Sequence, residues 1–247
     1  NVNWYMVFKD AETEDPKTPI ASGFPYTERQ LKRAARLAKF ACDYKEALVT
    51  ERVPIDVSRT GPLCMHQTKQ MFGITRVPAV PADKLLGGFP PTGRNAMVLV
   101  DDQVFIVPVS GQSADQIYGS LVECVGKLAK LGANRSPAIP ILTTEHRDRW
   151  ARQYELLEKL NRPALEAIND TLFAVCLDSV TPGNKDEAAA IALHGLDGGN
   201  RWFDKCIQFF VCPDGTAGCN GEHSPCDAVI PNQMTTYVLA QYFKATF

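Results

Sequence analysis

The sequence lacks long apolar runs and an excess of charge of one sign. No segment approaches the roughly 20 consecutive apolar residues of a membrane-spanning helix. The formal net charge at pH 7 is only -2, and basic residues form no cluster along the chain. A protein that binds nucleic acid or an anionic membrane through a basic surface carries such clusters. The sequence therefore predicts neither nucleic-acid binding nor a membrane span.

Two further signals are missing. No G-x-G-x-x-G joins a strand to a helix, so the sequence has no dinucleotide-binding fingerprint. The first residues, NVNWYMVFKD, contain neither the basic nor the apolar region of a secretory signal peptide. They also lack an initiator Met, and we expect the chain to be cut from a larger protein.

The eight cysteines include no close C-x2-C pair. In a chain of 247 residues without a secretion signal, reduced thiols are favoured over disulfides. We therefore expect an intracellular protein, and the sequence does not distinguish cytosol, mitochondrion and peroxisome. Four cysteines lie in apolar or helical surroundings, where a thiol behaves as a small buried hydrophobe: Cys42, Cys64, Cys124 and Cys176. The other four cluster late in the chain: Cys206, Cys212, Cys219 and Cys226.

Helical and strand patterns alternate along the chain. Capping boxes at Thr27–Gln30 and Ser113–Gln116 mark two helix starts. Apolar spacing predicts helices over about 28–50, 65–71, 113–132, 145–160, 163–175 and 186–193, and a last one that has Pro231 in its first turn. Strands are predicted over 1–9, 138–144, 205–211 and 216–222, and in a hairpin over 96–109. The pattern predicts a single α/β domain over 1–247, a mixed β-sheet flanked by helices.

The stretch GCNGEHSPCD, residues 218–227, concentrates chemically active side chains. Three interpretations of His223 follow from the residue types. The spacing C-x6-C-x3-H-x2-C supplies three thiolates and an imidazole for zinc: Cys212, Cys219, His223 and Cys226. The first two cysteines flank a predicted hairpin, however, and would have to face the same side.

The other two interpretations are catalytic. His223 can activate a cysteine nucleophile, Cys219 or Cys226, although nothing in the sequence marks either thiol as acidic. Alternatively, the neutral imidazole acts as a general base, with Asp227 four residues later supporting the cation that forms. Glycines 215, 218 and 221 would allow a substrate to approach the backbone closely. The spacing alone leaves these alternatives open, together with a purely structural role for His223 as a polar loop residue.

The segment GNRWFDKCIQFFVCPDGTAGCNGEHSPCDA resembles the signature region of the carnitine/choline acyltransferase family. Members carry an N-R-W-F-D-K strand, a D/N-G turn, a glycine, and E-H followed by an acidic residue four positions after the histidine. Other segments resemble the family in the same order: GPLC at 61–64, MF at 71–72, TRVP at 75–78, ILTT at 141–144, HR at 146–147, WA at 150–151, FAVCLD at 173–178 and LHG at 193–195.

The resemblance implies a function and two site residues. His223 is expected to be the catalytic histidine, and Asp227 occupies the place of the supporting acidic residue. The family transfers an acyl group directly between a thioester, usually acyl-CoA, and an alcohol hydroxyl such as that of carnitine. Neither a metal, a tightly bound cofactor nor a covalent acyl-enzyme is implied. Arg201 and Asp204 of the N-R-W-F-D-K strand are expected to form a buried structural pair.

Departures from the family qualify this expectation. Members are much longer, so the resemblance implies the N-terminal, catalytic-histidine half of a two-domain enzyme whose second half completes the site. The isolated chain is then expected to be nearly inactive. Because the linker Ser224-Pro225-Cys226 is unusual, the acceptor can be an alcohol other than carnitine. Domains of this type in fungal polyketide synthases move acyl chains from an acyl carrier protein to alcohols. For such a domain, an acyl carrier protein is the expected partner of this chain.

Two competing functions stay open. A zinc-stabilised binding module would use the Cys/His cluster. An inactive scaffold would keep the fold, or a docking surface for a carrier protein, without turnover.

Overall fold

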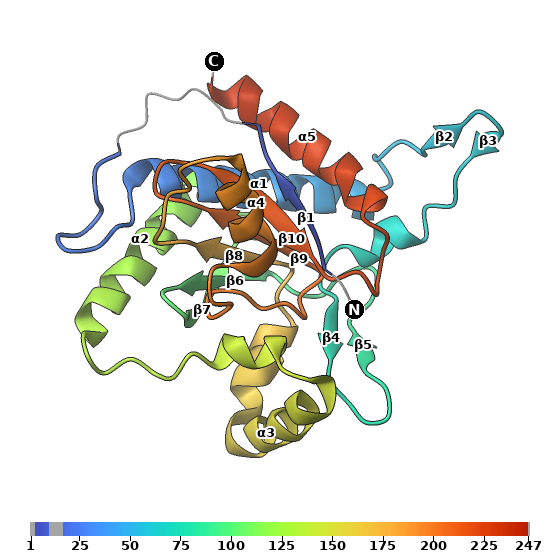
Figure 1. The fold of residues 1–247 in the computed structure, drawn as a ribbon. Helices are drawn as coiled ribbons and strands as arrows, with labels where there is room; N and C mark the ends of the chain where they lie inside the picture. The colour runs from blue at the N-terminus through green and yellow to red at the C-terminus, as the bar shows by residue number, and fades with distance from the viewer. Residues whose placement is uncertain (1–2, 10–16, 247) are drawn as a thin grey trace.

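The computed structural model describes residues 3–9 and 17–246 of the 247-residue chain (Figure 1). A six-stranded sheet runs through its centre in the order β1-β10-β9-β8-β6-β7. Its strands are β1 (Trp4–Val7), β6 (Asn95–Val100), β7 (Gln103–Pro108), β8 (Ala174–Leu177), β9 (Ile207–Val211) and β10 (Ala217–Gly221). β8 pairs in parallel with β6 and β9, whereas the outer pairs are antiparallel. The predicted mixed sheet is therefore confirmed.

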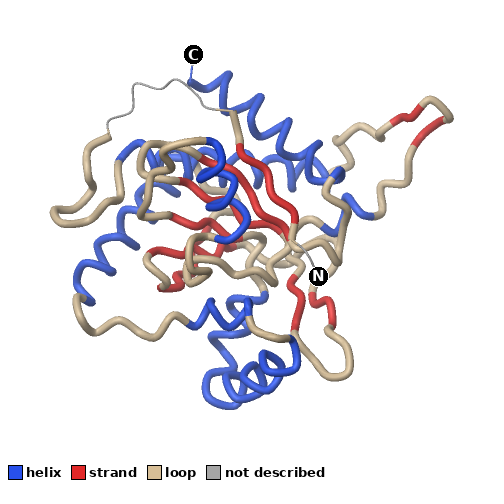
Figure 2. The backbone as a smooth tube through the Cα atoms, viewed as in Figure 1, coloured by secondary structure: helices blue, strands red, loops and turns tan. Residues whose placement is uncertain are grey.

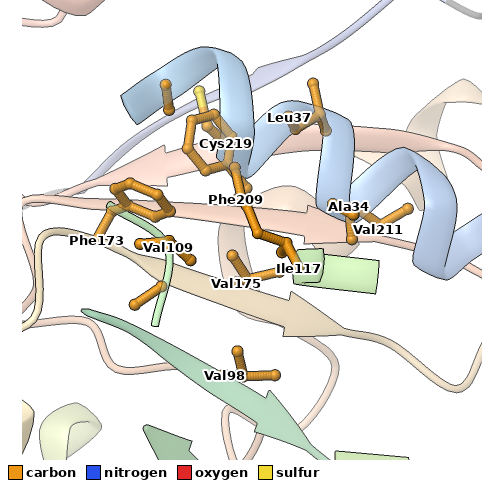
Figure 3. Close-up of a cluster of buried hydrophobic side chains, with 14 of the residues drawn as sticks. Ala34, Leu37, Val98, Val109, Ile117, Phe173, Val175, Phe209, Val211 and Cys219 are labelled. Atoms are coloured by element: carbon orange, nitrogen blue, oxygen red, sulfur yellow. The ribbon is translucent and has the colours of Figure 1, made fainter. Parts of the chain in front are cut away.

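Helices cover both faces of this sheet. They are α1 (Glu28–Val49), α2 (Ala114–Leu131), α3 (Arg147–Asn169), α4 (Lys185–His194) and α5 (Val229–Thr246). One core lies beneath α1, α2 and α5, and the other lies against α3 and α4. In β9, Phe209 points into the first core and Phe210 into the second, as the alternation of a strand requires. Figure 3 shows Phe209, Val211 and Val175 packed below Ala34 and Leu37 of α1.

Both capping boxes form as the sequence predicts. Thr27 accepts a hydrogen bond from the backbone N–H of Gln30 at the start of α1. The Gln30 amide also donates to the carbonyl oxygens of Asp178 (2.7 Å) and Val211 (2.6 Å), at the ends of β8 and β9. The cap therefore fixes the helix to the sheet as well as starting it. Ser113 and Gln116 form the equivalent box before α2.

The hairpin β6–β7 is also confirmed. Asp101 and Asp102 occupy its turn, and both have positive φ (49° and 64°), the backbone conformation of the tight turns that match strand twist. Strand β1 is shorter than predicted, and Asn1, Val2 and most of the following acidic loop lie outside the described residues.

Two predicted elements are wrong in type or extent. Residues 138–144 form a 3₁₀ helix, η2 (Ile139–Thr144), instead of a strand, because Pro140 cannot donate to a sheet ladder. The helix predicted to reach Val175 ends at Asn169. The apolar run that follows becomes β8, which is buried on both faces in the middle of the sheet; such a run cannot be distinguished from a buried helix by its period.

Two small hairpins emerge from a region that the sequence indicated as mostly irregular (Figure 2). They are β2–β3 (Val57–Ser58 and Gly61–Pro62) and β4–β5 (Thr75–Val77 and Lys84–Leu86). Only a short 3₁₀ helix, η1 (Gln67–Gln70), forms where a helix over 65–71 was predicted. Within the described part of the chain, no helix is both long and apolar enough to cross a membrane.

The glycines of β10 serve the chain's own packing. A Cβ at Gly218 would lie 2.1 Å from the backbone oxygen of Met6, and one at Gly221 would lie 2.0 Å from the Trp4 ring. At Gly215, whose φ is +96°, the neighbour is the Arg29 side chain. The prediction that these glycines make room for a substrate is wrong for Gly218 and Gly221, since Met6 and Trp4 of β1 already occupy the space.

We therefore expect Gly218→Ala to destabilise the chain by about 1–3 kcal/mol, the usual cost of overpacking. Its methyl group has to displace the backbone of β1 or the Phe210 ring. Gly126→Ala in α2 is the matched control, because nothing lies within 4 Å of its added Cβ. The control should stabilise the helix by about 0.5–1 kcal/mol. Urea denaturation of both variants measures the two free energies of unfolding; equal stabilities would contradict the expectation.

Candidate functional site

His223 lies in the turn between β10 and α5, two residues beyond the end of the strand (Figure 1). Its side chain is 44% exposed. The backbone enters the turn from a fixed position, because Glu222 still donates its N–H to the carbonyl oxygen of Cys206 beside the start of β9. The end of the sheet therefore fixes the backbone just before His223, and the imidazole lies at the molecular surface.

Asp227 closes the same turn. Its Oδ1 accepts the backbone N–H of Val229, the first residue of α5, at 3.0 Å and so caps that helix. Its Oδ2 lies 3.8 Å from Nε2 of His223. This distance is too long for a hydrogen bond but short enough for the carboxylate to stabilise an imidazolium. The structure therefore brings the two predicted site residues together, in a solvent-exposed pair of modest strength.

Glu222, immediately before the histidine, is a residue that the sequence prediction missed. Its side chain is only 1% exposed. Its carboxylate accepts hydrogen bonds from both the backbone N–H and the hydroxyl of Ser224, each at 2.9 Å. These bonds span His223 and fold the turn around it. The signal in the sequence is the E-H pair of the family resemblance, from which only the histidine receives a role.

The buried carboxylate of Glu222 pairs with Arg76 of β4, whose Nη1 lies 3.2 Å from Oε1. The Nε of Arg76 pairs with Asp83, in the turn of the β4–β5 hairpin, at 2.6 Å. One guanidinium therefore joins the histidine turn to the hairpin. Because these groups are largely withdrawn from water, salt screens them less than it screens surface pairs.

The ion pairs continue to α3 and β9. Nε of Arg147, at the start of α3, lies 2.8 Å from the same Asp83 oxygen, and its Nη1 lies 2.7 Å from Asp204. The indole N–H of Trp150 donates to the second oxygen of Asp204 at 2.7 Å. Burial raises the pKa of Asp204, and Arg147 opposes that shift. We call the alternating row Glu222–Arg76–Asp83–Arg147–Asp204 the ion-pair row.

The N-R-W-F-D-K segment uses its charges differently from the expectation. Arg201 forms a bidentate pair with Asp178 at the end of β8 (2.6 and 2.7 Å), and this pair is buried. The expected pairing of Arg201 with Asp204 is wrong, because Asp204 faces α3. Both pairs are nevertheless structural, and each joins neighbouring elements through a charge removed from water.

The cysteines do not gather around His223. Cys212 packs in the core against α3 and α4, whereas Cys219 and Cys226 pack in the core on the other face of the sheet. Among residues 3–9 and 17–246, no group of three His, Cys, Asp or Glu side chains is arranged to hold a metal ion. Burial raises the pKa of Cys226 to about 12 and that of Cys219 further. This geometry favours neither zinc coordination nor a thiolate nucleophile.

All eight cysteines are free thiols. Seven are buried, as a small apolar side chain would be, whereas Cys64 is exposed in the loop after β3. The expectation that Cys64 is a buried hydrophobe is therefore wrong, because its segment forms a protruding hairpin and not a packed helix.

A cavity with a volume of about 700 Å³ lies beside the ion-pair row. Its walls come mainly from η2, the start of α3 and the end of α4, and include Arg76, Thr143, His146, Arg147, His194 and Phe203. His223 is not one of the lining residues. Arg76 is common to both places, since it lines the cavity and holds Glu222.

Lys205 supplies a buried cation to the same region. Its ammonium group donates to the Thr75 hydroxyl (2.8 Å) and to the backbone oxygen of Asn169 (2.9 Å), and both acceptors are neutral. Burial without a carboxylate in hydrogen-bond contact lowers the pKa of Lys205 to about 8.

This shift predicts a pH dependence. Between pH 8 and 10.5 the unfolded chain binds more protons at this lysine than the folded chain, so the free energy of unfolding rises with pH. Lys205→Met removes the titrating group. We expect wild type to gain stability over this variant by up to about 3 kcal/mol across that interval. Urea denaturation at several pH values gives the difference, and a difference independent of pH would contradict the assignment.

Comparisons with known proteins give a consistent result. A sequence model of the family described as "Choline/Carnitine o-acyltransferase" matches residues 1–247. Carnitine O-acetyltransferase of Rattus norvegicus is 34% identical over 215 residues, covering 79% of this chain and 34% of the relative. Choline O-acetyltransferase of Homo sapiens is 34% identical over 236 residues, covering 87% of this chain and 31% of the relative. The chain spans about a third of the length of the curated relatives it matches.

Proposed function

The chain belongs to the choline/carnitine O-acyltransferase family, and from this premise we propose that it takes part in acyl transfer between a thioester and an alcohol. The thioester is acyl-CoA or an acyl-carrier-protein thioester, and the alcohol is a small molecule such as carnitine or choline. The curated relatives are named for acetyl transfer to carnitine or choline. Because the chain covers only about a third of them, the activity of the whole protein is part of the proposal.

His223 acts as the general base in this proposal. The observation that carries it is the exposed imidazole on a held turn, with the Asp227 carboxylate 3.8 Å from Nε2. The neutral ring takes the proton of the alcohol as the alcohol oxygen attacks the thioester carbonyl carbon. The C–O bond forms, the C–S bond breaks, and the imidazolium returns the proton to the departing thiolate. Both substrates react directly, so catalysis depends on holding them together at the ring.

A further part of the protein completes the site in this proposal. The imidazole is 44% exposed in the described structure, so the turn by itself does not enclose a reacting centre. Donors for the oxyanion that forms on the carbonyl, and walls that bind the acyl chain and alcohol, are then supplied by a second half. That view agrees with the share of the curated relatives, about a third of their length, that the chain matches.

We expect His223→Ala, in the full-length protein that contains this chain, to lower kcat by about 10²–10⁴-fold, the usual contribution of a general base. Steady-state assays use acyl-CoA and carrier-bound donors with a panel of alcohols, which also identifies the donor and acceptor. His66→Ala, at another exposed histidine, is the control and should retain wild-type turnover. The isolated 247-residue chain should give little or no turnover. Full activity of the His223→Ala variant would exclude the base assignment.

Asp227 has two roles that variants can separate. Asp227→Asn keeps a good helix cap but removes the negative charge near the ring. It should lower kcat while leaving the free energy of unfolding unchanged, because only the support of the imidazolium is lost. Asp227→Ala also removes the cap and should cost a further 0.5–2 kcal/mol of stability, roughly the value of such caps. Kinetic assays and thermal unfolding are measured on both variants. If Asp227→Asn has the kcat of wild type, Asp227 only caps α5 and does not support the imidazolium.

A further inference from the structure

The turn that carries His223 contains a second acidic residue besides Asp227, in a very different environment. Asp227 is exposed, whereas Glu222 is buried and bonded to both polar groups of Ser224. Since Glu222 and Ser224 flank His223, the Glu222 carboxylate restrains the backbone dihedral angles on both sides of the histidine. It therefore controls where the imidazole points, without needing to touch a substrate.

Arg76 stabilises the Glu222 carboxylate in its buried position. A buried carboxylate without a cation is costly and would shift toward water or bind a proton. Arg76 supplies that cation through Nη1, while its Nε remains bonded to Asp83. The backbone N–H of Arg76 also donates to the carbonyl oxygen of Asp204 at 2.8 Å, which ties β4 to the segment before β9. The guanidinium is thus held from two directions.

The remaining groups of the ion-pair row anchor this arrangement to rigid elements. Arg147 belongs to the first turn of α3, and its partner Asp204 also accepts the indole N–H of Trp150, which is fully buried. Asp83 accepts both guanidiniums at one oxygen, and its other oxygen accepts the backbone N–H of Ala79. The ion-pair row therefore fixes the histidine turn relative to α3 and to the β4–β5 hairpin.

We propose that Glu222 and Arg76 are positioning residues for His223: the Arg76 guanidinium fixes the buried Glu222 carboxylate, which folds the turn and aims the imidazole. This inference rests on the proposed function of His223 as the base. It adds that catalysis depends on a charge pair whose cation comes from β4, in a distant part of the chain.

The experiment breaks the pair from each end. Glu222→Gln has the same shape as the native side chain but removes the charge that Arg76 binds. Arg76→Lys keeps the charge, but one ammonium group cannot reproduce the planar fork through which Arg76 reaches two carboxylates. Glu158→Gln removes one partner of the exposed pair between Glu158 and Arg162 and is the matched control. Thermal unfolding of each variant establishes that it is folded at the assay temperature.

Kinetics of the full-length protein give the first readout. We expect Glu222→Gln and Arg76→Lys each to lower kcat by about 10–100-fold, the scale of a misplaced catalytic group. KM should change less than about twofold, because in this proposal both residues act through the turn and not on the substrate. The double variant should be no worse than the poorer single variant, since both break one unit. Glu158→Gln should behave as wild type. Unchanged kcat in both single variants overturns the proposal.

Hydrogen exchange of the chain gives a readout that does not depend on turnover. The Ser224 N–H donates to Glu222, so its exchange should accelerate at least tenfold in both variants. The Val229 N–H, which donates to Asp227, is the internal reference and should not change. A Ser224 exchange rate equal to that of wild type also overturns the proposal. If instead His223→Ala retains activity, the proposed function fails, while the exchange data still report whether Glu222 holds the turn.

Discussion

The contact between the buried Glu222 carboxylate and the Arg76 guanidinium joins the histidine turn to the rest of the molecule. Neither group can leave the other without cost, because each has lost much of its hydration and a buried charge needs a partner. Arg76 in turn shares Asp83 with Arg147, so the histidine turn, the β4–β5 hairpin and the start of α3 form one electrostatic unit. The exposed imidazole therefore lies in a turn whose backbone is held by buried, ion-paired side chains.

The sheet explains why this unit lies where it does. β8 pairs in parallel with both β6 and β9, and its own residues are all buried between the helices on the two faces. The charged groups of the ion-pair row lie beyond the strand ends, where Asp204 precedes β9 and Glu222 follows β10. These two strands are antiparallel, so the segment before one lies beside the segment after the other. The β9–β10 hairpin thus places Asp204, at one end of the ion-pair row, close to the histidine turn.

In the cysteine- and histidine-rich stretch, the difference in burial distinguishes the thiols from the imidazole as candidate reactive groups. The thiols of Cys212, Cys219 and Cys226 are enclosed in two different cores, where burial raises their pKa and keeps them apart, whereas the imidazole lies at the molecular surface. This sorting agrees with membership of a family described by O-acyl transfer. In the proposed function, the described residues supply the base and its support, and the groups that bind the two substrates belong to a further part of the protein.

Local patterns in the sequence determined the starts of α1 and α2 and the β6–β7 hairpin. A family resemblance that covers nearly the whole chain supplied the candidates His223 and Asp227. Capping boxes and tight turns involve residues a few positions apart, so their physics is present in the local sequence. Tertiary structure alone decided that Glu222 binds Arg76, 146 residues earlier, and that Arg201 binds Asp178 and not Asp204. It also placed residues 174–177 in the sheet. Such partners are selected by burial and by which charges meet when the sheet closes, and spacing along the chain carries no record of that choice.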